Sequence, residues 1–290
     1  MRSFIRTYAD AETRMQDTFD VAVVMPSLLR PQLRDALRSI FAQDITGRIQ
    51  VLIGIDTFEG DYSLVEAVCN ERPPQCTVQV FYPGYSTSRR HGGLGLAYDG
   101  GVLRCILSHI ANSQFVAYLD DDNYWRPDHL RLLRDAISQA DWAFSLRWFM
   151  HPVSRRPICV DEWESVGPGR GLFKDAYGGF VDPSCLMLNK IACEGVLPWW
   201  NRPMRGDLNS MSADRSVFAA LCRSFKGAGT NAPTTFYQMN PADPVHAARM
   251  QLIGDAYGQA ECSELVTPAF VSCPDDGDYR ERCYTYERRD

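Results

Sequence analysis

The sequence lacks the features that mark membrane, secreted and zinc-binding proteins. No segment approaches the roughly 20 apolar residues that a helix needs to cross a bilayer, and the first 19 residues lack the apolar core of a signal peptide. The ten cysteines are scattered and include no CxxC pair, so neither a zinc site nor a redox motif is indicated. We therefore expect a cytoplasmic protein with no transmembrane segment, whose cysteines are reduced and buried.

An excess of positive charge is also missing. The chain carries 30 Lys and Arg residues against 36 Asp and Glu residues, a formal net charge of −6. Because proteins that bind nucleic acids usually present a basic patch, we expect no nucleic-acid partner. A nucleotide ligand is still compatible with this charge, since a bound metal ion can neutralise a diphosphate locally.

The chain does contain apolar runs that alternate with amphipathic segments. With 290 residues and 45% hydrophobic content it can bury a substantial core. Short apolar runs that predict strands lie at residues 21–26, 49–55, 77–81, 115–119 and 142–149, with helical patterns between most of them. This order predicts an α/β protein with a mostly parallel central sheet flanked by helices. Ligands of such sheets bind outside the carboxyl ends of the strands.

An acidic triplet follows the fourth of these runs, in the segment FVAYLDDDNYWRP. Asp120, Asp121 and Asp122 repel one another unless a cation or solvent relieves the repulsion. Since side chains alternate along an extended backbone, Asp120 and Asp122 can point the same way while Asp121 turns aside. Such a pair of carboxylates suits Mn²⁺ or Mg²⁺. A solvated acidic turn before the next helix is the alternative that the spacing alone leaves open.

The order of the motifs resembles the GT-A nucleotide-sugar glycosyltransferases, most closely glycosyltransferase family 2. The segments that carry the resemblance are, in order, VAVVMPS, VLIGID, YLDDDNYWRPDHL, VDPSCLMLN and SADRSVF. The acidic triplet resembles the DxD motif of that family. The resemblance implies a GT-A (Rossmann-like) fold. It also implies a metal-dependent, inverting enzyme of the hexosyltransferase type, which transfers a sugar from a nucleotide-diphosphate sugar, with UDP-sugars favoured, to an acceptor hydroxyl.

The same resemblance divides the chain into parts. Residues 1–19 are polar, compatible with a helix, and form a lead-in arm, while residues 20–225 form the catalytic domain. Within that domain the nucleotide-sugar half ends near residue 125, and the acceptor half runs over residues 126–225. Residues 151–182 are rich in Gly and Pro, which predicts long loops that select the substrate. Residues 226–290 are expected to pack on the domain as an extension.

Several residues of the first half are expected to bind the donor. The resemblance implies that Pro26, Ser27 and Leu28, after the first strand, face the nucleobase. Asp56, at the end of the second strand, would contact the base or the ribose. Arg90 precedes a glycine-rich loop, where its charge could meet a phosphate, although a solvated loop is the simpler alternative.

The acidic triplet and one histidine are expected to hold the metal ion. By resemblance, Asp120 faces the ribose or the metal, Asp122 binds Mn²⁺ or Mg²⁺, and Asp121 is the variable middle residue of the donor-binding motif. His246, in NPADPVHAARM, is a candidate third metal ligand, as in some GT-A enzymes. A histidine beside helix-like residues is also compatible with simple packing.

The candidate catalytic base is Asp214. An inverting transfer needs a base to take the proton of the acceptor hydroxyl, and related enzymes often carry it in a Glu-Asp pair at a late helix start. The matching place here is Ala213-Asp214, so the first acid is missing. Asp207 in RGDLN is a rival, and an acid in the first turn of a helix also suits the helix dipole.

Two other functions are also compatible with the sequence. A nucleotidyltransferase also joins an α/β sheet to metal-binding acids, but MPSLLRP replaces the glycine-rich, basic loop expected after its first strand. A non-catalytic nucleotide-sugar binding protein would explain the departure at Ala213. The acceptor, whether a glycan, a small molecule or a peptide, is not indicated by the sequence.

Overall fold

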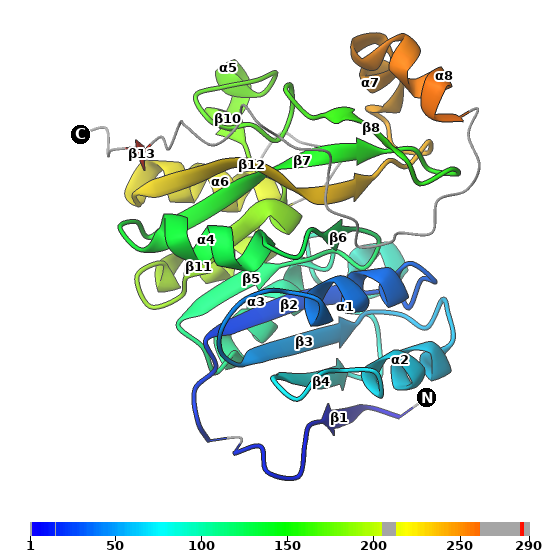
Figure 1. The fold of residues 1–290 in the computed structure, drawn as a ribbon, viewed down its shortest axis with the longest axis vertical. Coiled ribbons are helices and arrows are strands. Elements are labelled where there is room, and N and C mark those ends of the chain that lie inside the picture. The colour runs from blue at the N-terminus through cyan, green and yellow to red at the C-terminus, as the bar shows by residue number, and fades with distance from the viewer. Residues whose placement is uncertain (1, 15, 205–212, 262–284, 287–290) are drawn as a thin grey trace.

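One large mixed sheet forms the centre of the molecule. The computed structural model describes residues 2–14, 16–204, 213–261 and 285–286. Along the sheet the strands follow the order β1-β4-β3-β2-β5-β11-β7-β12-β13 (Figure 1). Helices cover this sheet on both sides, which confirms the α/β class expected from the sequence.

The parallel core of the sheet consists of four strands. They are β2 (Val21–Ser27), β3 (Ile49–Ile55), β4 (Cys76–Tyr82) and β5 (Phe115–Tyr118). Strand β2 pairs in parallel with both β3 and β5, and β3 pairs in parallel with β4. Nearly every residue of β2 and β3 is buried, because both faces are covered and a continuous apolar run is then favoured over alternation.

The second half of the sheet continues past residue 225. Strand β11 (Leu186–Asn189) lies antiparallel between β5 and β7 (Trp142–Met150). Strand β12 (Gly227–Gln238) then pairs in parallel with β7. At Gly227 an added Cβ would lie 2.4 Å from the Trp142 ring. The close approach of β12 to β7 therefore requires glycine at position 227. Because glycine is depleted in strands, the sequence pattern of residues 227–238 did not predict β12.

Shorter strands complete the structure. Strands β6 (Tyr124–Trp125) and β13 (Thr285–Tyr286) pair with β12, β8 (Pro157–Val160) pairs with β7, and β9 (Gly167–Pro168) pairs with β10 (Gly179–Phe180). A short helix, α5 (Lys174–Tyr177), lies between β9 and β10. The segment that was expected to form long loops therefore holds three short strands and a helix.

The lead-in arm forms an edge strand rather than a helical segment. Strand β1 (Phe4–Tyr8) pairs antiparallel with β4, and the Phe4 ring packs edge to face on Tyr62 with centroids 5.2 Å apart. The three central residues of β1 are exposed. An edge strand that is solvated in this way lacks the apolar alternation that identifies a strand in a sequence.

Three helices cover one face of the sheet. They are α1 (Leu33–Phe41), α2 (Tyr62–Cys69) and α4 (His129–Ile137), which bury apolar side chains against β2 and β3. In α1, Leu33, Leu37 and Ile40 recur at helical spacing and are fully buried. Burying each such side chain contributes roughly 1.5–3 kcal/mol.

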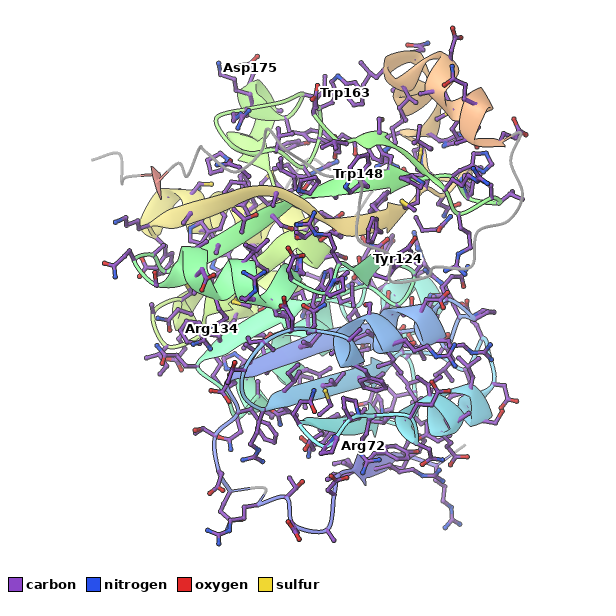
Figure 2. All side chains as sticks on the ribbon, viewed as in Figure 1. Arg72, Tyr124, Arg134, Trp148, Trp163 and Asp175 are labelled. Carbon is purple, nitrogen blue, oxygen red and sulfur yellow. The ribbon has the colours of Figure 1, made fainter. Side chains whose placement is uncertain are left out.

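The opposite face is covered by α3 (Gly101–Ile110), the 3₁₀ segment η3 (Glu194–Asn201) and α6 (Asp214–Ser224). Side chains crowd the space between the sheet and its helices (Figure 2). The described cysteines are all free. Within the described ranges, none of the helices is both long and apolar enough to cross a membrane.

Two further helices lie near the end of the sheet beyond β8 (Figure 1). They are α7 (His246–Ile253) and α8 (Asp255–Glu261). Ile253 packs with Phe149 of β7 and Met239 in a small separate cluster. The chain after residue 225 thus contributes both a strand of the central sheet and a helical cap.

The buried histidine His129 makes the stability of this fold depend on pH. Its ring stacks on Trp125 with centroids 4.2 Å apart, and its Nδ1 lies 2.7 Å from Thr234 Oγ1. Burial lowers the pKa of His129 to about 3. The unfolded chain takes up this proton near pH 6.5 and the folded chain does not, so stability falls as the pH drops below that value.

Because the unfolded chain takes up a proton on His129 and the folded chain does not, we expect the free energy of unfolding to fall by about 2 kcal/mol between pH 7 and pH 5. Urea unfolding at both pH values measures the loss. His129→Phe keeps a stacked ring but cannot take up the proton, so its stability should change less with pH. Equal losses in the two proteins would contradict a neutral, buried His129.

Candidate active site

A pocket of about 190 Å³ lies at the carboxyl ends of β2, β3 and β5. The predicted donor-binding and metal-binding residues that line it are Pro26, Ser27, Leu28, Asp56, Arg90, Asp120, Asp121 and Asp122. The acidic triplet, the end of the second strand and the turn after the first strand therefore meet, as the parallel order of the strands predicts. Arg30 and Arg104 also line the pocket, and neither arginine was expected there from the sequence.

Asp121 ties the turn after β2 to the acidic triplet. Its Oδ2 accepts hydrogen bonds from Ser27 Oγ at 2.7 Å and from the backbone N–H of Leu28 at 2.9 Å. Ser27 Oγ in turn accepts from the N–H of Leu29, whose φ is +61°. A left-handed conformation costs a non-glycine residue roughly 1–2 kcal/mol, which these bonds offset. Asp121 is buried and acts within the protein's own framework.

Asp120 pairs with a buried arginine. Arg104, on α3, donates one guanidinium N–H to Asp120 and another to the backbone carbonyl of Asp99. Its Cζ lies 5.4 Å from the centroid of the Trp200 ring. One feature of the sequence indicates that Arg104 is buried: it lies on the same helix face as the buried residues Leu107 and Ser108.

Asp122 pairs with an arginine that is partly exposed. Arg30 Nη1 lies 2.5 Å from Asp122 Oδ2 and 3.6 Å from Asp121 Oδ1. The side chain of Arg30 is 40% exposed and that of Asp122 is 33% exposed. Desolvation, followed by the charges of Asp121 and Asp120, raises the pKa of Asp122, although Arg30 opposes the shift. Asp122 is therefore a carboxylate whose ionised form gains from an additional cation.

Asp56 fastens the loop beside the pocket. Its carboxylate accepts from Ser86 Oγ at 2.7 Å and from both the N–H and the Oγ1 of Thr87 at 2.8 Å. Two carboxylate oxygens can accept about four hydrogen bonds, which leaves capacity for one from a ligand. Arg90 follows this loop in η1 (Arg89–His91) and extends over Tyr98, with its Cζ 5.6 Å from the centroid of the ring.

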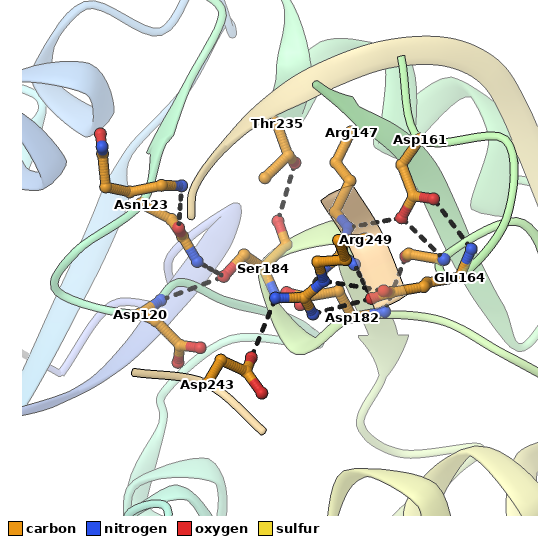
Figure 3. Close-up of polar contacts among 12 residues, drawn as sticks. Asp120, Asn123, Arg147, Asp161, Glu164, Asp182, Ser184, Thr235, Asp243 and Arg249 are labelled. Atoms are coloured by element: carbon orange, nitrogen blue, oxygen red, sulfur yellow. Dashed lines mark hydrogen bonds and ion pairs between the residues drawn. The ribbon is translucent and has the colours of Figure 1, made fainter. Parts of the chain in front are cut away.

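Ser184 connects the acidic triplet to the second half of the sheet (Figure 3). Its hydroxyl accepts from the Asp120 N–H at 3.3 Å and from Asn123 Nδ2 at 3.0 Å. Its carbonyl accepts from Trp125 Nε1 at 2.7 Å. Its own N–H donates to Asp182 Oδ1 at 2.8 Å. The backbone of the triplet is thereby fixed relative to Asp182.

A network of buried charges extends from Asp182. Arg147, on β7, is 1% exposed and donates to Asp161 at 2.7 Å, to Glu164 at 2.8 Å and to Asp182 at 2.6 Å. Arg249, on α7, donates to both carboxylate oxygens of Glu164 (Figure 3). Buried charges are tolerated when they are paired and hydrogen-bonded. The network therefore ties α7 to the site through two arginines.

Asp214, the candidate base, is the first residue of α6. Its Oδ1 accepts from the N–H of Arg215 at 2.7 Å. Burial raises the pKa of Asp182, and the charges of Asp120 and Asp214 add to this effect, whereas Arg147 opposes it. Asp214 therefore lies within electrostatic range of Asp182, although it does not line the pocket. The rival Asp207 lies outside the described residues.

His246 does not line the pocket. It is the first residue of α7, where its ring lies 6.0 Å from that of Tyr257 and its backbone N–H donates to the Asp243 carbonyl. His246 therefore packs against Tyr257 of α8, in agreement with simple packing, the alternative that the sequence left open. His246 is therefore absent from the lining of the pocket to which the acidic triplet contributes.

Two carboxylates of the pocket suit a divalent ion. Across the described ranges, no group of three or more His, Cys, Asp and Glu side chains forms a preassembled metal site. Asp120 and Asp122 are nevertheless both partly exposed and line the same pocket. Mg²⁺ is commonly held by one or two carboxylates, with phosphate and water oxygens as further ligands. These residues therefore fit Mn²⁺ or Mg²⁺ when a ligand supplies the remaining oxygens.

A larger groove of about 1270 Å³ adjoins this site. Apolar side chains such as Phe81, Tyr85, Leu94 and Ile106 form much of its lining, and His91 is shared with the smaller pocket. The acidic triplet does not contribute to this groove. We therefore assign the chemistry to the smaller pocket, where the titratable groups converge.

Comparison with known proteins supports the fold assignment. No protein-family model and no curated protein matches the chain. It is similar to the solved structure of TarS from S. aureus, with a TM-score of 0.53 and 13% identity, covering 81% of this chain and 39% of that chain. TarS 1-349 in complex with UDP-GlcNAc gives a TM-score of 0.54 and 13% identity, covering 83% of this chain and 69% of that one.

A mannosyltransferase gives a comparable match. The structure of PcManGT from Pyrobaculum calidifontis in complex with GDP-Man and Mn²⁺ has a TM-score of 0.50 and 12% identity, and covers 88% of this chain and 68% of that chain. At such identities the likeness concerns the fold. The chain has the GT-A fold, as the sequence predicted.

The members of the acidic triplet should differ in their effects on stability. Asp121→Ala leaves Ser27 Oγ and the Leu28 N–H without their buried acceptor, so it should lower the free energy of unfolding by about 2 kcal/mol. Asp122→Ala removes a partly exposed ion pair and should cost less than about 1 kcal/mol. Urea unfolding of both variants measures the difference. The reverse order would contradict the framework role of Asp121.

Proposed function

We propose that the protein is a metal-dependent glycosyltransferase of the hexosyltransferase type, which uses a nucleotide-diphosphate sugar. The observation that carries this proposal is the convergence of Asp56, the turn after β2 and the acidic triplet at one pocket of a GT-A fold. The similar structures contain UDP-GlcNAc, UDP, or GDP-Man with Mn²⁺. They support a nucleotide-diphosphate sugar as the donor, and we favour a UDP-sugar.

The proposed roles follow from the positions of the side chains. Pro26, Ser27 and Leu28 line the pocket and would face the nucleobase or ribose, and Asp56 keeps acceptor capacity for a donor hydroxyl or N–H. Asp120 and Asp122 would hold a divalent ion, which when bound stabilises the negative charge on the leaving diphosphate. The two partly exposed carboxylates would thus bind the ion, whereas buried Asp121 accepts the hydrogen bonds that fix the turn after β2.

The proposed transfer inverts the configuration at the anomeric carbon of the sugar. The acceptor oxygen forms a bond to the anomeric carbon, the bond from that carbon to the phosphate oxygen breaks, and the acceptor proton passes to Asp214. The position of Asp214 at the start of α6, near the charge of Asp182, supports this role. Asp207 remains the other candidate for the base.

Donor hydrolysis tests the enzyme class. We expect the purified protein with Mn²⁺ to hydrolyse a UDP- or GDP-sugar slowly to the nucleoside diphosphate, measured by chromatography. Asp122→Ala should lower the rate about 100-fold or more, since several kcal/mol of charge stabilisation depend on the ion. Asp135→Ala, which removes an exposed carboxylate of α4, serves as the control. Release of pyrophosphate from a sugar phosphate and a nucleoside triphosphate would instead indicate a nucleotidyltransferase.

Asp214→Asn tests the base. We expect turnover to fall about 10²–10⁴-fold, the usual contribution of general base catalysis. Affinity for UDP or GDP with Mn²⁺ should stay within about twofold, because the variant retains every predicted donor-binding residue. Calorimetry measures the affinity. Unchanged turnover would exclude Asp214 as the base, and metal-dependent nucleotide binding by a wild-type protein without turnover would identify a binding protein.

A further inference from the structure

Arg30 has an unusual position in the pocket. It follows left-handed Leu29 in a turn that Asp121 holds in place, so its backbone is fixed. Its guanidinium lies against Asp122, at 2.5 Å, and near Asp121, at 3.6 Å. The side chain is long and 40% exposed. Because the backbone of Arg30 is fixed and its side chain is long and partly exposed, the guanidinium can move within the pocket while the turn stays in place.

The two arginines of the pocket differ in how firmly they are held. Arg104 is 5% exposed, with Asp120, the Asp99 carbonyl and the Trp200 ring around it. Within the described ranges, the ion-pair partners of Arg30 are Asp121 and Asp122. An exposed ion pair contributes little and is easily broken, whereas removing the partner of a buried arginine leaves an uncompensated buried charge and is costly. A competing cation would therefore displace Arg30 from Asp122 well before it displaced Arg104 from Asp120.

A donor would supply a new partner for Arg30. Arginine binds phosphate oxygens through two parallel N–H groups, a geometry that also serves for carboxylates. The pocket of about 190 Å³ is smaller than the roughly 300–1,000 Å³ typical of small-molecule sites. Because Arg30 is part of its lining, movement of Arg30 away from Asp122 changes the space available beside the metal-binding carboxylates.

We propose that Arg30 exchanges between two anions, Asp122 and the diphosphate of the donor, and so positions the leaving group. Asp122 is released to a divalent ion as the guanidinium moves to the phosphate oxygens. Arg30 thus competes with the metal ion for the carboxylate and cooperates with it in binding the nucleotide. This inference rests on the proposed function, since it needs a diphosphate ligand in this pocket.

The exchange predicts opposite effects of a single substitution. In Arg30→Met, which keeps the apolar stem of the side chain, Mn²⁺ alone should bind about threefold to tenfold more tightly, because the competitor of Asp122 is gone. UDP and GDP at saturating Mn²⁺ should bind about tenfold more weakly, because a charge-assisted contact is lost. A merely structural role for Arg30 would weaken both interactions.

The experiment measures Mn²⁺ affinity by electron paramagnetic resonance and nucleotide affinity by calorimetry. Arg131→Met is the matched control, since Arg131 is 44% exposed on α4 and pairs with carboxylates outside the pocket; both of its affinities should equal those of the wild type. Arg30→Lys keeps a point charge without the guanidinium fork and should give intermediate values. If Arg30→Met fails to fold, Arg30→Gln and Arg30→Lys provide the same comparison.

The outcomes separate this inference from the function on which it rests. Weaker Mn²⁺ binding by the Arg30 variants, or unchanged nucleotide affinity, would overturn the exchange even if the wild type binds nucleotide. A wild-type protein that binds neither UDP nor GDP with Mn²⁺ would overturn both the exchange and the proposed donor. Tighter Mn²⁺ binding together with weaker nucleotide binding supports the exchange.

Discussion

The site depends on the hydrogen bonds that the Asp121 carboxylate accepts from the turn after β2. Ser27 and Leu28 donate these bonds, and they join the carboxyl ends of β2 and β5, two neighbouring parallel strands. Ser27 Oγ also accepts from the N–H of left-handed Leu29. Because the carboxylate of Asp121 is used in this way, the two flanking acids keep separate arginine partners and remain accessible at the pocket.

Charge pairing organises the region around this framework. Asp120 has Arg104, Asp122 has Arg30, and Asp182 has Arg147, so each of these acids faces a guanidinium. Burial of unpaired carboxylates would be costly, and the arginines offset that cost to different extents. The pairs made by the buried arginines Arg104 and Arg147 preserve geometry, as a preorganised site requires, whereas the partly exposed Arg30 can adjust to a ligand. Arg249, in the chain after residue 225, belongs to the same network because it donates to Glu164.

The sequence predicted the parallel strands and the acids at their ends, because apolar runs and consecutive carboxylates are local signals. Besides the short strands, β1 and β12 escaped prediction for physical reasons. In β12 the sequence GAGTNAPTTFYQ carries glycines that the close approach to Trp142 requires, and β1 is a solvated edge. The arginine partners were missed since an ion pair joins residues distant in sequence, such as Arg147 and Asp182. His246 was grouped with the acids by resemblance to GT-A enzymes, whereas in the structure its ring lies beside that of Tyr257.

The unequal roles of the acidic triplet follow from the turn that the triplet itself forms, combined with the turn after β2. Strand β5 ends at Tyr118, and the Asn123 N–H donates to the Asp120 carbonyl at 3.1 Å, so the triplet lies in a turn rather than on the expected extended backbone. A turn does not by itself determine which acid points into the framework. The Ser27 hydroxyl and the Leu28 N–H decide this, because they offer two donors to Asp121 at the edge of the neighbouring strand. A DxD-like motif can therefore keep a middle acid for a structural reason, and the flanking acids retain the accessibility that ligand binding requires.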